Sequence, residues 1–312
     1  MTAQTLRIVL KLCELTGQDT VYALPMIFAD KLKTQFVVTS ELTPPKGTNL
    51  DGLLSTASAL RECVDAINVT DSHSARMSMS PLAAAHLLID EGIEPILQLV
   101  TRDRNRIALQ SDMLGAFALG IRNLVCMGGD SPAVGDHPDA KPVFDLATTE
   151  LIGAARCLNK GMDLGGCELK TPTNFCIGAV VNPGASDLAM EISRMEEKVA
   201  AGASFFQTQA VYDITAFEDF LAGVRHLNVA IIAGVMPIKS VKMALYANEK
   251  IPGITIPEDL IRQIDQADDV AATSIRLAAE TVAALRGVCA GVHLMTLGAE
   301  QRIPYILESA GL

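Results

Sequence analysis

The chain has 312 residues, of which 25 are basic and 36 are acidic, so its formal net charge is −11. This acidic balance opposes a general affinity for phosphate backbones or anionic lipid and disfavours nucleic acid as a partner. No uninterrupted apolar stretch approaches the roughly 18 residues that span a bilayer, so we expect no membrane segment.

Seven cysteines are scattered along the chain and none forms a C-x-x-C pair. This odd set predicts neither a disulfide framework nor a zinc or iron–sulfur site, and it fits a reducing cytoplasm. We therefore expect cytoplasmic localisation and no bound metal. Most of these cysteines should be small apolar core residues.

The first residues are predicted to form an N-terminal extension, 1–26. Met1–Pro25 carries leucine, isoleucine and valine interrupted by single charges, which is a helical pattern without a convincing signal-peptide cleavage site. The segment could plug the amino-terminal face of a barrel or dock on a partner. The alternative is that Met26 is the natural start and the preceding stretch is an annotation artefact.

From residue 27 to 312 we predict one α/β unit, a (β/α)8 TIM barrel. Eight apolar runs are candidate strands, and helical patterns such as Ile107–Leu119, Leu188–Ala201, Phe217–Val224 and Ile275–Leu285 lie between them. Alternating strands and helices favour a parallel sheet, and eight units close a barrel. The candidate strands are Phe36–Leu42, Ala66–Thr70, Ile96–Val100, Leu124–Met127, Phe175–Val181, Phe205–Val211, Val229–Val235 and Val292–Leu297.

Two longer connections interrupt this alternation. Ser131–Leu146 is rich in proline, glycine and aspartate and follows a strand end, so we expect it to wall the site. Asn248–Asp269 precedes the last helices.

Acidic side chains stand where two of the predicted strands stop. Glu41 lies at the end of the first strand, three residues before a Pro44-Pro45 pair, and Asp130 follows the fourth strand after two glycines. In a barrel, the carboxyl ends of all strands open on one face, where barrel enzymes carry their chemistry. The sequence therefore predicts that Glu41 and Asp130 face the same mouth.

Other polar residues fall at strand ends, and each is costly to bury without a hydrogen-bond partner. Their convergence indicates a ligand site, although any single one could be a satisfied polar residue of the barrel interior. They are Thr70, Asp71, Gln98, Asn182, Gln207, Thr208 and Gln209.

Several common cofactor motifs are missing from the sequence. No G-x-G-x-x-G follows a strand, and no G-x-x-x-x-G-K-[ST] occurs, which disfavours a Rossmann domain and a nucleotide triphosphatase. The five histidines show no H-E-x-x-H spacing, which makes a zinc hydrolase improbable. His293, inside the last apolar strand, is predicted to be a core histidine bonded to a neighbour.

Several short blocks, in order along the chain, resemble the methylenetetrahydrofolate reductase family. The resemblance covers about Ile27 to Leu312, and it rests on the colinearity of the blocks rather than on any single one. The blocks are Glu41–Lys46, Thr101–Asn105, Gly120–Asn123 leading into Gly128–Asp130, Thr208–Asp213, Gly234–Ile238 and His293–Leu297. That family is a flavin-binding eight-stranded barrel.

The resemblance implies flavin-dependent reduction of 5,10-methylenetetrahydrofolate to 5-methyltetrahydrofolate, a step in one-carbon metabolism and methionine biosynthesis. Glu41 matches the general acid that opens the five-membered ring, and burial is expected to raise its pKa. Asp130 matches the acid beside flavin and pterin. Gln209 and Leu297 fall at substrate-binding positions.

The resemblance also implies a set of cofactor contacts. The matched positions are Thr70, Gln98, Gly129, Asp130, Phe144, Asn182, Glu191, Arg194 and Lys198, with Lys198 near the diphosphate. Phe144 replaces an expected tyrosine, and Glu191 and Arg194 replace an aspartate and an asparagine. The resemblance implies FAD as the cofactor. FMN is the alternative, because these substitutions change contacts that the family makes to the adenylate half of FAD.

Two sources of electrons stay open at this point. One is NADH or NADPH acting directly on a self-sufficient enzyme, which could be a homo-oligomer. The alternative is a flavin-binding catalytic subunit of a multi-subunit electron-transfer complex, supplied by an iron–sulfur partner subunit.

Overall fold

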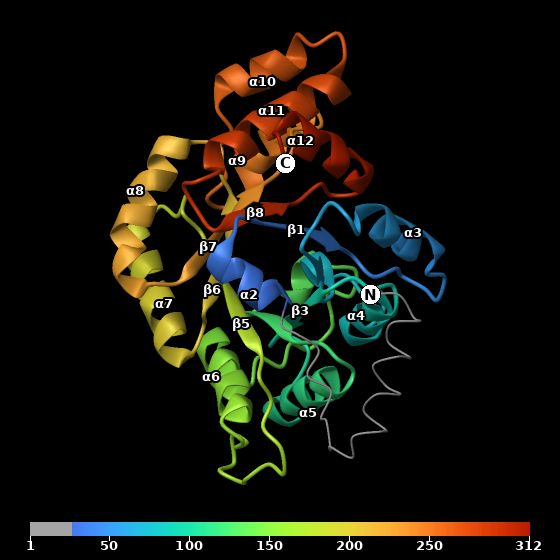
Figure 1. Ribbon diagram of the computed structural model, residues 1–312, viewed down its shortest axis with the longest axis vertical. Coiled ribbons are helices and arrows are strands. Elements are labelled where there is room, and N and C mark those ends of the chain that lie inside the picture. Colours follow the sequence, from blue (N-terminus) through green and yellow to red (C-terminus); the bar gives the residue numbers. More distant parts are fainter. Residues whose placement is uncertain (1–26) are drawn as a thin grey trace.

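The computed structural model describes residues 27–312, and these fold into a closed barrel of eight parallel strands (Figure 1). Every predicted strand overlaps one observed strand, which confirms the TIM barrel. The strands are β1 (Val37–Leu42), β2 (Ala66–Val69), β3 (Pro95–Val100), β4 (Asn123–Met127), β5 (Cys176–Val181), β6 (Phe205–Ala210), β7 (Ala230–Val235) and β8 (Gly291–Leu294).

The barrel closes because β1 pairs with β8 as well as with β2. Val37 lies opposite Gly291 in the β1–β8 pair, and Thr39 lies opposite Ala66 in the β1–β2 pair. All eight pairs are parallel. Consequently every strand ends at the same rim.

Helices cover the outside of the ring (Figure 1). They are α3 (Asp51–Leu60), α4 (Pro81–Asp90), α5 (Arg106–Ala118), α6 (Thr148–Asn159), α7 (Leu188–Ala201), α8 (Ile214–Val224), α9 (Val241–Lys250), α10 (Glu258–Asp265), α11 (Val270–Leu285) and α12 (Ile303–Ser309), with single 3-10 turns η1 (His73–Ala75), η2 (Pro132–Val134), η3 (Arg225–Leu227) and η4 (Glu300–Arg302). The four helices named from the sequence are all present, with ends shifted by up to five residues.

The connection expected over Asn248–Asp269 contains a further helix, α10. Glu258 and Asp259 lie in its first turn, where the helix dipole favours acidic residues. Ile264 is its buried residue, and α10 packs on α9 and α11. A helix of only eight residues shows too few turns for its periodicity to stand out in the sequence.

A short helix, α2 (Ile27–Thr34), lies across the amino-terminal end of the barrel (Figure 1). Phe28 and Leu32 pack against the inward side chains at the start of the strands, and the ring of Phe28 meets that of Phe205 edge to face at 5.5 Å. The Phe28 amide donates to Glu94 at 2.8 Å. This helix closes the floor of the barrel. The helix predicted over Met1–Pro25 lies outside the described residues.

The strands are apolar on both faces near the floor, as expected for a parallel sheet that is covered by helices. Their outward side chains join the helices in one large core, and their inward side chains form the smaller cluster beneath α2. Higher in the barrel the inward residues become polar. That change in polarity marks where the site begins.

Candidate active site

Several of the predicted strand-end residues converge at the carboxyl-terminal mouth of the barrel. The parallel pairing brings these ends to one rim, and alternation along the strands turns the polar side chains inward. The residues brought to the mouth are Glu41 on β1, Thr70 after β2, Gln98 on β3, Gly129 and Asp130 after β4, Asn182 after β5, Gln209 on β6 and Leu297 after β8.

Glu41 sits in the upper part of β1 with its side chain 16% exposed, and its Oε2 lies 3.6 Å from Nε2 of His293 on β8. Burial raises the pKa of Glu41, but the close approach and charge of His293, with a smaller effect of His73, outweigh it. The pKa therefore lies below its ordinary value. The sequence prediction of a raised pKa is wrong, because it considered burial without the histidine.

A buried polar layer lies directly beneath Glu41. Nδ1 of His293 is 3.0 Å from the Thr39 hydroxyl and 3.4 Å from Nε2 of Gln207. The side chains of Gln207 and Asn68 form a reciprocal amide pair at 2.7 and 3.1 Å. The prediction that His293 is a core histidine bonded to a neighbour is confirmed, since it is 3% exposed.

Gln209 is directed into the mouth by an irregularity in its strand. The β6–β7 register shifts between Gln207 and Ala210, and the Gly234 amide donates to the Thr208 hydroxyl at 2.9 Å in place of a regular ladder bond. Bulges of this kind commonly re-aim a side chain beside an active site. Gln209 is half-buried, and its Oε1 accepts from the backbone amide of Ala210 at 3.1 Å.

The end of β4 is held by an arginine that the sequence analysis left without a role. The Arg102 side chain is 3% exposed, pairs with Asp103 at 2.7 Å and donates to the Asp130 carbonyl at 3.3 Å. Gly129 has φ +87°, and a Cβ there would approach Cβ of Val100 to 3.0 Å. The backbone is thereby fixed, and the exposed Asp130 carboxylate is presented at the rim.

Two exposed apolar residues flank the mouth in strained backbone conformations. Phe144 has φ +41° and is 44% exposed, and Leu297 has φ +50° and is 42% exposed. The Phe144 amide donates to the Thr101 carbonyl at 3.1 Å, which places the Ser131–Leu146 connection beside the end of β3. Non-glycine residues with positive φ cluster at functional sites, where surrounding contacts maintain the strain.

Helix α7 adds charge on the β5 side, with Glu191 in its first turn and Lys198 in its last. The Asn182 amide donates to Glu191 at 3.0 Å, and Glu191 also lies 3.9 Å from Arg194. Lys198 donates to the Val180 carbonyl at 2.7 Å, at the top of β5. Burial lowers the pKa of Lys198, and Glu191 only partly offsets this effect.

Asp71, one of the strand-end residues, faces the supporting structure and not the open mouth. It accepts from the Val100 amide at 2.9 Å and pairs with Arg104. Burial raises its pKa, and Arg104 opposes that effect. By contrast, the Thr70 hydroxyl reaches Thr43 at 3.1 Å on the inner rim, and Gln98 is half-buried there.

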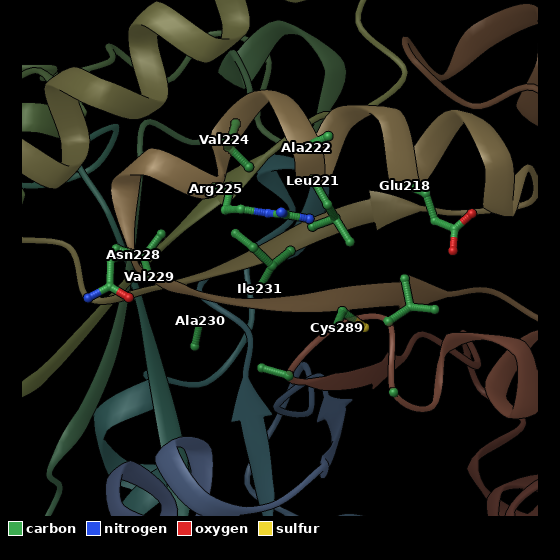
Figure 2. Close-up of a pocket in the computed structure, with 13 residues that line it drawn as sticks. Glu218, Leu221, Ala222, Val224, Arg225, Asn228, Val229, Ala230, Ile231 and Cys289 are labelled. Atoms are coloured by element: carbon green, nitrogen blue, oxygen red, sulfur yellow. The ribbon is translucent and has the colours of Figure 1, made fainter.

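A separate cavity of about 540 Å³ lies at the other end of the barrel, between α8, η3 and the segment before β8 (Figure 2). Arg225 extends over Leu221 and Ile231, and Glu218 lies at the far side. None of the predicted site residues lines it. Within residues 27–312 there is no group of three potential metal ligands, and no helix is long and apolar enough to cross a membrane.

Solved structures with a similar fold are distant in sequence. A putative lyase/mutase from Burkholderia cenocepacia J2315 superimposes with a TM-score of 0.52 at 12% identity, covering 88% of this chain and 82% of that one. A 2,3-dimethylmalate lyase of the PEP mutase/isocitrate lyase superfamily gives 0.50 at 10% identity, covering 91% and 87%. These similarities show the fold alone.

Sequence relatives are more specific. Methylenetetrahydrofolate reductase 2 of Schizosaccharomyces pombe is 27% identical over 244 residues, 70% of this chain and 36% of that protein. Methylenetetrahydrofolate reductase (NADH) 1 of Arabidopsis thaliana is 32% identical over 207 residues, 62% and 34% respectively. The chain thus spans about a third of the length of these relatives. The sequence model of the methylenetetrahydrofolate reductase family matches residues 27–311, and with the barrel and the strand-end acids in place, the chain belongs to this family.

Proposed function

We propose that the chain reduces 5,10-methylenetetrahydrofolate to 5-methyltetrahydrofolate with a flavin bound in the barrel mouth. The observation that carries this proposal is Glu41, a carboxylic acid held inside the mouth of a barrel whose sequence matches the family over residues 27–311. Asp130 and Gln209 lie at the same rim. This arrangement provides an acid, a fixed negative charge and an amide to orient a pterin.

The side chains present suit a flavin. Thr70 and Gln98 offer a hydroxyl and an amide to the polar edge of a ring system, and the exposed Val180 and Leu297 offer apolar surface to its face. Lys198 supplies a positive charge beside the end of β5, where a phosphate group would be bound. When bound, a reduced flavin would supply the hydride that reaches the methylene carbon of the substrate.

The chain's own residues prepare the substrate for that hydride. We assign Glu41 the transfer of a proton to the ring nitrogen, which opens the five-membered ring to an iminium cation. Asp130 stabilises that cation by its fixed negative charge. The amide of Gln209 donates and accepts together, so it can pair with the amide-like edge of the pterin and hold it in register.

The identity of the flavin and of the electron donor forms the finer part of the proposal. We favour FAD over FMN, because FAD is the flavin that the resemblance to the family implies. The relatives are named for NADPH in Caenorhabditis elegans and for NADH in Arabidopsis thaliana, which supports direct reduction by a nicotinamide over an iron–sulfur partner subunit. Both nicotinamides therefore belong in the test.

The first test is anaerobic purification of the chain, identification of the flavin released on denaturation, and absorbance on adding NADH, NADPH or 5-methyltetrahydrofolate. Bleaching of the flavin by a nicotinamide supports a self-sufficient reductase. Bleaching by 5-methyltetrahydrofolate alone supports a folate site that depends on a partner for electrons. A chain that binds no flavin and responds to none of the three contradicts the proposed function.

Glu41→Gln tests the acid directly. We expect folate reduction to fall by about 10²–10⁴-fold, the usual contribution of a general acid, while flavin binding and bleaching by nicotinamide persist. Glu62→Gln is the matched control, because Glu62 is exposed on the turn before β2. Normal folate turnover by the Glu41→Gln enzyme would contradict the assigned role.

A further inference from the structure

His293 is the residue through which Glu41 is connected to the barrel interior. Its Nε2 faces the Glu41 carboxylate at 3.6 Å, and its Nδ1 faces the Thr39 hydroxyl at 3.0 Å. Both ring nitrogens therefore have polar neighbours, one above and one below. The side chain is 4% exposed, so these neighbours and not water determine its orientation.

The neighbours below the ring are themselves fixed. Asn68 donates to the Gln207 carbonyl oxygen at 2.7 Å, and Nε2 of Gln207 donates to the Asn68 oxygen at 3.1 Å. This reciprocal pair determines which end of the Gln207 amide carries the protons. The remaining proton on Nε2 points toward Thr39, at 3.5 Å, and toward Nδ1 of His293, at 3.4 Å.

Contact with His293 lowers the pKa of Glu41. Burial alone disfavours the carboxylate, but the close approach and charge of His293, supplemented by His73 of η1, outweigh that effect. With His293 neutral, its charge no longer stabilises the carboxylate and burial favours the protonated acid.

We propose that His293 is a positioning residue for the reaction: its Nε2 holds the Glu41 carboxyl group in place and supplies the proton that Glu41 passes to the substrate. This role rests on the proposed function. It extends the machinery from the rim into the polar layer of Thr39, Asn68 and Gln207, whose contribution is to fix the ring.

The Nε2–H bond of His293 breaks as the Glu41 O–H bond forms, which converts a carboxylate beside a protonated imidazole into a carboxylic acid beside a neutral imidazole. The Glu41 O–H bond then breaks as the substrate N–H bond forms, which leaves a carboxylate beside the neutral imidazole. A proton from solvent, entering through the mouth by way of the Glu41 carboxylate, restores the Nε2–H bond of His293 before the next turnover.

His293→Gln is the central variant, because a glutamine amide can donate to Glu41 but cannot titrate. We expect kcat for folate reduction to fall by about 10- to 100-fold, less than the loss of the acid itself, with KM changed by about threefold or less. The kcat–pH profile should lose one ionisation. His226→Gln is the matched control, since His226 forms an exposed pair with Glu196 at 3.0 Å.

His293→Asn is the second variant. The asparagine amide should lie near the position of Nδ1, so this variant keeps the contact with Thr39 and loses the contact with Glu41. In a Glu41→Gln background, neither variant should lower kcat further, because His293 acts through Glu41. A soluble His293 variant with the wild-type kcat and pH profile would overturn the proposal and leave the proposed function intact.

A second readout does not depend on turnover. A double-mutant cycle of Glu41→Gln and His293→Gln in the free energy of unfolding should show coupling, because the two side chains are in contact. A cycle without coupling overturns the link between the two groups. If the cycle shows coupling but the wild-type chain reduces no folate, only the proposed function is contradicted.

Discussion

The floor of the barrel offers a sharp test of the packing, because one helix closes it with one aromatic side chain. Phe28 of α2 is fully buried and meets Phe205 edge to face at 5.5 Å. Replacing a buried phenylalanine by alanine typically costs about 3–5 kcal/mol, of which an aromatic pair accounts for about 0.5–1.5 kcal/mol. We expect Phe28→Ala to lower the free energy of unfolding by that amount.

The assay is equilibrium urea unfolding of the wild type and Phe28→Ala, with reversibility checked by refolding. Tyr246→Ala is the control, since Tyr246 is 60% exposed on α9, and it should change stability by about 0.5 kcal/mol or less. A cycle with Phe205→Ala should give a coupling of about 0.5–1.5 kcal/mol. A loss below about 1 kcal/mol for Phe28→Ala would show that α2 does not close the floor as described.

Two further predictions concern the strands and the loops. Gly178→Ala should lower the free energy of unfolding by about 1–3 kcal/mol, because a Cβ there would overlap the ring of Phe205. The control Gly153→Ala, in open space on α6, should raise it by about 0.5–1 kcal/mol. Equal effects of the two substitutions in urea unfolding would refute the overlap. The ion pair with Lys46 holds the pKa of Asp136 well below its ordinary value, so the carboxylate stabilises its loop above pH about 4 and loses that effect as pH falls through the lowered pKa. Asp136→Asn should therefore speed hydrogen exchange of the β2–α4 loop amide it binds at pH 7, and unchanged exchange would contradict this role.

The barrel was predictable because each strand is a short apolar run ended by glycine, proline or a polar residue, as in Val37–Leu42 before Pro44. Parallel pairing then brought Glu41 and Asp130 to one rim without further information. The short helices α2 and α10 were harder to recognise, because few turns give a weak periodic signal.

The electrostatics of the site were not predictable from the local sequence. Glu41 and His293 are 252 positions apart, and only barrel closure makes β1 and β8 neighbours. One signal was available in the sequence: alternation along β1 places Thr39 and Glu41 on the same, inward face of the strand. It did not indicate that His293 would lie beside them. Arg102 was part of a recognised block, but its contact with the Asp130 carbonyl depends on the folded loops.

The closed floor makes the barrel a chamber with one entrance. Beneath the polar layer, Phe28, Ile96, Val125 and Phe205 form an apolar seal. A ligand that fills the mouth therefore also cuts Glu41 off from the bulk solution. The pH of the solvent then sets the protonation state of Glu41 and His293 at the moment the ligand binds. Later proton transfers use only the protons that these groups and the ligand already carry.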